Sequence, residues 1–310
     1  MNFNTLHVCL IGIHPLKSFN NILNLVQRIL KFNTQKINIK INILYDTTDK
    51  ESYQLKDLFY KSEPIIQSFI NWIEYESRFL NSGNKFLSRN YASLIVQNEP
   101  IEFYVNQELP DSDFLLRCRS DYYLTDEFLQ MVLDREFYKK LDNSNEKLPI
   151  FNKKLWMPYM GKEYIFDCCD YFYITSIKDQ RNIIITDKNE AEFLWFDPFS
   201  EDKKFFAERI FFVKPLLDFL KNNKINKPTK EYWDLIHSNF SLGGDPSPIK
   251  TCFYGWRNSA WCGYGNTGYK VSKDINNMQI STHAQKIAPY SNLDPTNFKT
   301  LELHPDKYIY

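Results

Sequence analysis

The sequence has no excess of charge of either sign. Its 38 lysines and arginines balance 38 aspartates and glutamates, and basic pairs such as Lys139-Lys140 and Lys203-Lys204 are scattered along the chain. A protein that binds nucleic acid regardless of its sequence normally carries a basic excess or a basic stripe. The composition therefore argues against a general nucleic-acid-binding protein, and we expect no nucleic-acid partner.

Long apolar runs are missing as well. No stretch reaches the roughly 18 consecutive apolar residues that a membrane-spanning helix needs, and the chain does not open with a basic segment, an apolar stretch and a cleavage site. We therefore expect no transmembrane segment and a cytoplasmic protein. Peripheral association with the inner face of the membrane stays open.

Several signature motifs are also lacking. None of the six cysteines shows the Cys-x-x-Cys spacing of a structural zinc site, so we interpret most of them as buried thiols in a reducing compartment. The loop Gly243-Gly244-Asp245 belongs to no Gly-x-Gly-x-x-Gly or Gly-Lys-Ser/Thr motif. No Gly-x-Ser-x-Gly elbow is present either. These absences argue against a dinucleotide site, a Walker-type phosphate site and a serine hydrolase.

What is present is enough chain for a large core. The 310 residues are 43% apolar and 16% aromatic, and apolar strand patterns alternate with amphipathic helical ones. This order predicts an α/β fold with a Rossmann-like core of mixed sheet and flanking helices. We expect the core over residues 1–230 and a loop-rich extension over 231–310, where glycine and tryptophan gather.

The predicted elements follow from hydrophobic spacing. Strands are expected at 6–15, 37–45 and from Phe114, and two further strands at 154–158 and 165–174, joined around Gly161. Helices are expected from the cap Ser18 onward, over 52–80 with a break at Pro64, over 88–96, after the cap Thr125, and over 205–220. In the first helix the spacing predicts one buried stripe: Ile22, Leu25, Val26, Ile29 and Leu30.

The strand that begins at Phe114 is the centre of the functional hypothesis. Its apolar run Phe114-Leu115-Leu116 ends in charged residues: Arg117, Arg119 and Asp121. Small molecules bind outside the carboxyl ends of strands in open α/β sheets, so these groups are expected to face a ligand. Asp121 is suited to a sugar or a divalent ion, and the arginines to phosphates. The structural alternative is an ion pair between Arg119 and Asp121.

An Asp-x-Asp triplet also precedes this strand. Asp111-Ser112-Asp113 follows Pro110 and comes before the apolar run. We therefore interpret it as the turn into the strand rather than as a metal site.

Other candidates lie at predicted strand ends and on a predicted helix. His14 follows the first strand and Asp46 the second, where each is placed to contact a ligand. A loop hydrogen bond for His14 and a turn or cap role for Asp46 are the structural alternatives. Candidate general bases for an acceptor hydroxyl are Asp167, Asp170 and Glu208, with surface ion pairing as the alternative for each.

Three segments together resemble a known family. Arg89-Asn90-Tyr91, the strand from Phe114 to Asp121, and Lys154-Leu155-Trp156-Met157-Pro158 with Asp167-Cys168-Cys169-Asp170 are similar to the WavE-type lipopolysaccharide-synthesis and capsular polysaccharide family. The resemblance covers residues 85–220. It implies a GT-A-like glycosyltransferase fold and adds Arg89 to the donor-binding candidates. Asp121 then corresponds to the Asp-x-Asp motif of such enzymes.

One departure from that pattern leaves the cofactor open. Arg119 stands in the place of the first acid of the motif. Either a divalent ion, Mn or Mg, binds at Asp121, or Arg119 performs part of the ion's work on the diphosphate.

These patterns together predict a glycosyltransferase. The expected partners are a nucleotide-sugar donor and a saccharide acceptor that belongs to a bacterial capsule or lipopolysaccharide. The expected catalysis stabilises the departing nucleotide diphosphate electrostatically and assists the acceptor hydroxyl with a base. Two other classes stay open: a carbohydrate-binding protein without turnover, and a phosphoryl or nucleotidyl transferase at the same site.

Overall fold

The computed structural model describes residues 5–12, 14, 16–76, 103–104, 106–120, 122–142, 150–157, 160–161, 172–183, 222, 239–242, 253–255, 259–261, 269–271, 278–280 and 287–288. The first half holds β1 (Thr5–Ile11), α1 (Phe19–Phe32), β2 (Asn38–Asp46), α2 (Lys50–Ser62), α3 (Pro64–Gln67), β3 (Ile70–Tyr75), β4 (Phe114–Arg119), β5 (Tyr122–Leu124), α5 (Asp126–Val132) and α6 (Arg135–Leu141). Then come β6 (Leu155–Met157), β7 (Met160–Gly161), β8 (Phe172–Ser176), α7 (Ile177–Gln180), β9 (Phe240–Leu242), β10 (Phe253–Gly255), β11 (Ser259–Trp261), β12 (Tyr269–Val271), β13 (Met278–Ile280) and β14 (Ile287–Ala288).

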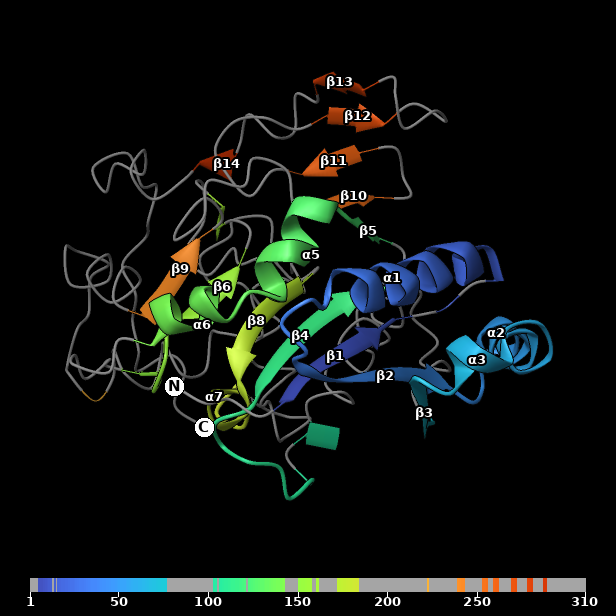
Figure 1. Ribbon diagram of the computed structural model, residues 1–310, viewed down its shortest axis with the longest axis horizontal. Helices are drawn as coiled ribbons and strands as arrows, with labels where there is room; N and C mark the ends of the chain where they lie inside the picture. Colours follow the sequence, from blue (N-terminus) through green and yellow to red (C-terminus); the bar gives the residue numbers. More distant parts are fainter. Residues whose placement is uncertain are drawn as a thin grey trace, which may run out of the picture.

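The main sheet is mixed and has seven strands in the order β3-β2-β1-β4-β8-β6-β9 (Figure 1). Strands β3, β2, β1 and β4 run parallel, whereas β8 is antiparallel to β4 and to β6. The chain moves outward from β1 to β3 and then crosses to β4 on the other side of β1. The strand order therefore reverses between β1 and β4, as in nucleotide-binding α/β folds. The predicted α/β class with a mixed sheet and flanking helices is confirmed.

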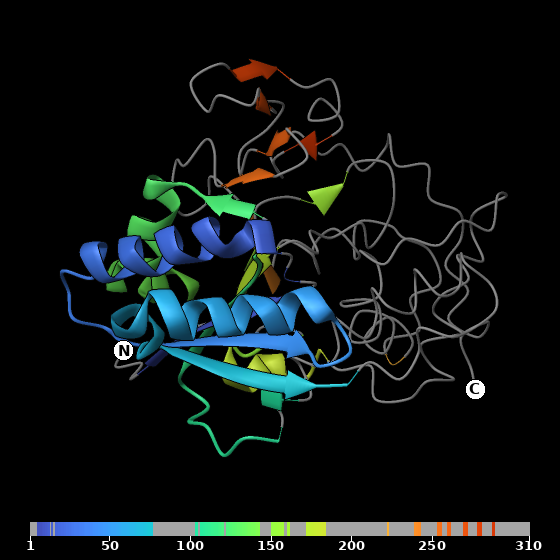
Figure 2. The ribbon, with the colours of Figure 1, turned by 90° about the vertical axis from the view of Figure 1, so that its right-hand side faces the viewer.

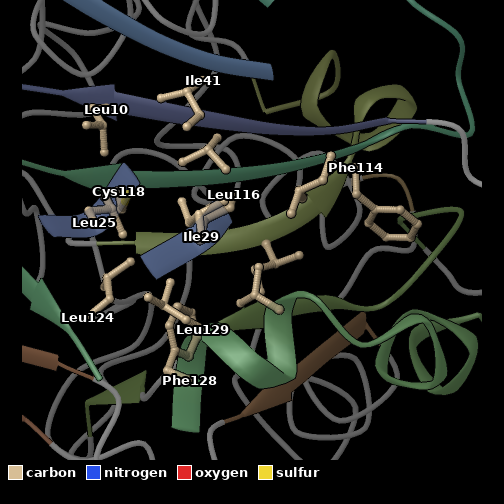
Figure 3. Packing of buried hydrophobic residues seen from close by; sticks show 14 of the residues in the cluster. Leu10, Leu25, Ile29, Ile41, Phe114, Leu116, Cys118, Leu124, Phe128 and Leu129 are labelled. Carbon is tan, nitrogen blue, oxygen red and sulfur yellow. The ribbon is translucent and has the colours of Figure 1, made fainter. Parts of the chain in front are cut away.

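Helices cover one face of this sheet. Figure 2 shows α1 and α2 over the same side of strands β1 to β3, and α5 continues this layer beside α1 in Figure 1. The buried stripe of α1 packs against alternate strand residues, among them Leu10 and Leu116, with Phe128 and Leu129 of α5 in the same cluster (Figure 3). A second, smaller cluster lies on the opposite face of the sheet: Cys9, Ile11, Leu44, Tyr75, Tyr104, Leu115 and Ile177.

Most of the elements predicted in the first half are present. Ser18 holds the N-cap position of α1, although its side chain makes no capping hydrogen bond. Thr125 caps α5 by accepting a hydrogen bond from the Phe128 amide. In the predicted stripe of α1, the prediction that Leu30 is buried is wrong. Its side chain is exposed because it lies on the outer side of the helix, whereas Ile22, Leu25, Val26 and Ile29 are buried.

The prediction of helix over 52–80 is wrong over 70–75, and its last residues, 77–80, lie outside the described residues. Pro64 begins the short α3, and the chain then forms β3 at the edge of the sheet. Apolar residues lie on both sides of this strand, since Ile70 belongs to the larger cluster and Tyr75 to the smaller one. A strand covered on both faces does not alternate between apolar and polar residues, so its spacing resembles that of a helix.

The pair of strands predicted around Gly161 is partly corrected. The first is present as β6, but Gly161 lies inside β7, which pairs with β14 and forms no turn in these residues. Strand β8, Phe172–Ser176, agrees with the predicted second strand over 172–174, and residues 165–171 lie outside the described residues. The predicted helices over 88–96 and 205–220 lie outside the described residues.

Residues of the predicted C-terminal extension contribute strands to both larger sheets. Strand β9 pairs with β6, and β10 pairs with β5 to open a five-stranded antiparallel sheet in the order β13-β12-β11-β10-β5. The boundary at residue 230 stays a prediction. Across the described part of the chain, no helix combines the length and the apolarity that crossing a bilayer requires.

Candidate functional site

The candidate site is the edge of the main sheet where the parallel strands β1, β2 and β4 end. Described residues follow each of these strands: Gly12 and His14 after β1, residues 47–49 after β2 and Ser120 after β4. The strand order reverses between β1 and β4, which is the position at which open α/β sheets bind ligands. We call this region the carboxyl edge.

Gly12 lets the chain leave β1 at the carboxyl edge. Its φ of 111° is one that residues with a side chain rarely adopt. A Cβ atom at this position would meet nothing within 4 Å. Packing therefore does not require glycine here, but the backbone conformation does. The sequence reasoning missed this residue, because a single glycine at a strand end carries no distinctive pattern.

His14 joins the ends of three elements. Its ring Nδ1 lies 2.6 Å from the Ser120 hydroxyl and its Nε2 lies 2.7 Å from the Leu44 carbonyl oxygen. Because a carbonyl oxygen only accepts, Nε2 carries the proton. The backbone amide of His14 donates to the Ser52 hydroxyl at 3.0 Å. The ring is fully buried, so these contacts make His14 a structural link, and binding of a donor by this side chain stays a prediction.

The segment after β2 forms a turn that is also bonded to the end of β3 through Thr47, whose amide donates to the Tyr75 carbonyl at 2.9 Å. Asp46 Oδ1 accepts hydrogen bonds from the Thr48 amide at 2.9 Å and from the Thr48 hydroxyl at 2.7 Å. Asp49, rather than Asp46, caps α2 by accepting from the Ser52 amide. The turn role that we left open for Asp46 is therefore present, and ligand binding by Asp46 stays a prediction.

The two arginines of β4 differ in their surroundings. Arg117 is fully buried, and its guanidinium carbon lies 5.1 Å from the centre of the Tyr173 ring. Arg119, the last residue of β4, is partly exposed and lies 5.3 Å from the centre of the Tyr122 ring. Arg119 is therefore the better placed of the two to reach a phosphate at the carboxyl edge.

Asn21 is a residue of this edge that the sequence reasoning missed. It lies in the first turn of α1, and its Nδ2 donates to the Ser120 carbonyl at 2.6 Å and to the Tyr122 carbonyl at 2.8 Å. The only signal in the sequence is its place beside the buried Ile22 near the start of a helix that follows the first strand. That signal does not reveal contacts with residues about a hundred positions away.

A charged cluster lies farther along the same edge, where β2 and β3 end. The Lys56 ammonium donates to the Tyr45 hydroxyl at 2.6 Å and to Glu74 Oε1 at 2.9 Å, and the Tyr45 hydroxyl donates to the same oxygen. Burial alone would lower the pKa of Lys56, but the hydrogen bonds to Tyr45 and Glu74 outweigh it and raise this pKa. Burial and the Glu74 hydrogen bond both raise the pKa of Tyr45. Neither group is therefore prepared to act as a base near neutral pH.

The triplet Asp111-Ser112-Asp113 lies at the opposite end of β4. Asp113 is buried and accepts from the Thr5 amide at 3.1 Å, and its second oxygen lies 3.4 Å from Nε2 of His7. Asp111 pairs with Arg181 on the surface. The interpretation of this triplet as the turn into the strand is confirmed.

Five predicted site residues lie outside the described residues: Arg89, Asp121, Asp167, Asp170 and Glu208. Their roles therefore stay predictions. Within the described ranges, no three His, Cys, Asp or Glu side chains converge to hold a metal ion.

No protein-family model matches the chain, and no curated protein matches it in sequence. Among solved structures, the fold is similar to that of 4-diphosphocytidyl-2C-methyl-D-erythritol synthase from Anaerococcus prevotii, with 12% identity and a TM-score of 0.29. The match covers 61% of this chain and 82% of that one. A likeness of this size carries no argument about function, and the WavE-type resemblance stays a prediction.

Proposed function

We propose that this chain is a glycosyltransferase that moves a sugar from a nucleotide-sugar to a bacterial surface polysaccharide, either capsule or lipopolysaccharide. The observation that supports it most is the reversal of strand order between β1 and β4, because α/β folds bind nucleotides at such a point. His14, which follows β1, contacts the Ser120 hydroxyl after β4 and the Leu44 carbonyl of β2 there. The sugar-transfer part of the proposal depends on the motifs around Arg89, Asp121 and Asp170.

In this proposal the donor diphosphate lies over the carboxyl edge. Arg119 approaches it from the end of β4, and a guanidinium there offsets the charge that develops on the departing nucleotide. Asp121 holds the donor sugar or a divalent ion, Mn or Mg. One of Asp167, Asp170 and Glu208 takes the proton from the acceptor hydroxyl. In this proposal the growing polysaccharide that accepts the sugar brings the protein to the inner face of the membrane.

Binding of the donor can be tested by thermal unfolding. We expect one of UDP-, GDP- or CMP-sugars to raise the melting temperature, because a ligand that binds only the folded state at about 100 times its Kd adds about 2.7 kcal/mol of stability. Each titration is run with and without Mn²⁺, so that a metal requirement is seen separately. No shift with any nucleotide-sugar would contradict the proposal.

Transfer itself is tested by the variant Asp121→Asn. We expect it to abolish release of the nucleoside diphosphate or monophosphate from the donor while the circular dichroism spectrum and the melting temperature stay close to those of the wild type. The matched control is Asp111→Asn, because Asp111 pairs with Arg181 at the opposite end of β4 and should leave transfer unchanged. Equal activity of the two variants would exclude Asp121 from the site.

The product identifies the class of reaction. A glycosyltransferase releases a nucleoside diphosphate or monophosphate from a nucleotide-sugar. A nucleotidyl transferase joins a nucleoside triphosphate to a sugar phosphate and releases pyrophosphate from the triphosphate. A carbohydrate-binding protein would respond to saccharides in thermal unfolding and show neither product. Pyrophosphate release, or a saccharide response alone, would therefore replace the proposed reaction.

A further inference from the structure

The backbone on both sides of Asp121 is held by one side chain. Asn21 Nδ2 lies 2.6 Å from the Ser120 carbonyl oxygen and 2.8 Å from the Tyr122 carbonyl oxygen. Both partners only accept, so the group that faces them is the amide NH₂, which has one hydrogen for each. In the sequence, the residue between these two carbonyls is Asp121. We call this arrangement the Asn21 clamp.

The helix that carries Asn21 is itself fixed against the same part of the chain. Two turns later, Arg28 Nε donates to Asp126 Oδ1 at 2.6 Å and its Nη2 donates to the Leu124 carbonyl at 2.7 Å. The Arg28 guanidinium also lies 4.4 Å from the centre of the Tyr123 ring. Since α1 is anchored to β5 and to the start of α5, Asn21 is held in place relative to the turn that it contacts.

The same turn is held from a second direction. Nδ1 of the buried His14 lies 2.6 Å from the hydroxyl of Ser120. Ser120 therefore has its carbonyl fixed by α1 and its side chain fixed by the loop after β1. These contacts lie at the point where the strand order reverses.

We propose that Asn21 is a positioning residue, which fixes the backbone of Ser120 and Tyr122 on either side of Asp121 in the sequence and thereby supports the role proposed for Asp121 at the donor site. The inference rests on the proposed function, because it assigns Asn21 a task in that same site. Asn21 itself need not touch the donor. A shift of a reacting group by about 1 Å can reduce a rate about 100-fold, so loss of the clamp should be visible in kcat.

The test compares Asn21→Ala with Asn20→Ala in the full-length protein. Both positions lie in the first turn of α1, and Asn20 is exposed whereas Asn21 contacts the turn. Alanine raises helix propensity at either position, so α1 should form in both variants. We expect Asn21→Ala to lower kcat per folded molecule by about 10- to 100-fold, and Asn20→Ala to leave it within about twofold.

A conservative variant separates positioning from stability. Asn21→Gln keeps the amide NH₂ on a longer side chain, and we expect it to recover part of the lost kcat. It also keeps the inference testable if Asn21→Ala does not fold. Measuring KM beside kcat adds a readout that a loss of folded protein alone does not change.

The outcomes distinguish this inference from the proposed function. An active wild type whose kcat and KM are the same in Asn21→Ala and Asn20→Ala would overturn the positioning role and leave the glycosyltransferase proposal intact. A wild type that shows neither nucleotide binding nor transfer would overturn both. A fall in kcat that is confined to Asn21→Ala and partly restored in Asn21→Gln supports the Asn21 clamp.

Discussion

Asp113 offers the sharpest test of how the amino-terminal edge of the sheet is held together. Its carboxylate accepts from the Thr5 amide at 3.1 Å and lies 3.4 Å from Nε2 of His7, and the groups are buried. Replacing Asp113 by alanine leaves two buried groups without this acceptor. Each such loss costs about 1–3 kcal/mol, so we expect Asp113→Ala to lower the free energy of unfolding by about 2–6 kcal/mol. This is a large part of the roughly 5–15 kcal/mol that stabilises a typical domain.

The matched control lies two residues earlier in the same turn. Asp111 pairs with Arg181, but their side chains are 55% and 30% exposed, and a surface ion pair contributes about 0–1 kcal/mol. Asp111→Ala should therefore cost no more than about 1 kcal/mol. The stability lost in Asp113→Asn should lie between the losses in Asp113→Ala and Asp111→Ala. The carbonyl of the new asparagine can still accept from the Thr5 amide, and its NH₂ can donate to a His7 ring that carries its proton on the other nitrogen.

The assay is urea unfolding followed by circular dichroism, with the slope of the unfolding free energy against urea checked for each variant. An unchanged slope means that stability, and not the size of the unfolded surface, has changed. If Asp113→Ala costs no more than Asp111→Ala, the buried network contributes nothing and the reasoning is wrong. If Asp113→Asn costs as much as Asp113→Ala, the hydrogen bonds of residue 113 with Thr5 and His7 do not account for the lost stability.

Two further predictions concern titrating groups on the face of the sheet opposite α1. Burial lowers the pKa of His7 below its ordinary 6.5 despite the hydrogen bond to Asp113, so the unfolded chain binds the proton more readily than the folded one. The free energy of unfolding should therefore be highest above pH 6.5 and fall, by up to about 1.4 kcal/mol per pH unit, as pH drops toward the pKa of folded His7. Subtracting the profile of His7→Asn isolates this effect, and parallel profiles would contradict it. Burial raises the pKa of the Cys9 thiol to about 12. Cys9 should therefore resist alkylation at pH 8 in the folded protein and react in urea, as measured by peptide mass mapping. Fast alkylation of Cys9 in the folded protein would refute this prediction.

The parts of the fold that sequence reasoning predicted are those with a strong local pattern. The apolar run of β4 and the buried stripe of α1 can each be recognised within one segment of the sequence, and both are present. Strand β3 was missed because burial on both faces removed the alternation that identifies a strand. Asp46 and Asp113 illustrate a second limit: the pattern showed acids at strand ends, but only the contacts show that both accept hydrogen bonds from the protein itself.

The candidate site was harder to predict because its contacts join residues that are distant in the sequence. His14 and Asn21 lie about a hundred positions before Ser120, and neither belongs to a motif. Their roles follow from the sheet topology, which places the end of β1 and the start of α1 beside the end of β4. A prediction made from residue types at fixed spacing cannot contain such pairs until the strand order is known.

The protons in the network around His14 limit what each side chain at the carboxyl edge can do. Leu44 accepts from Nε2, so a neutral ring accepts at Nδ1 from the Ser120 hydroxyl. Ser52 in turn donates to Asp49 and accepts from the His14 amide. In this arrangement the Ser120 proton is directed at the imidazole and not toward a ligand, and the Ser120 and Tyr122 carbonyls are directed at Asn21. Because both neighbours of Asp121 are engaged in this way, the decisive test of chemistry at this edge is the substitution of Asp121 itself.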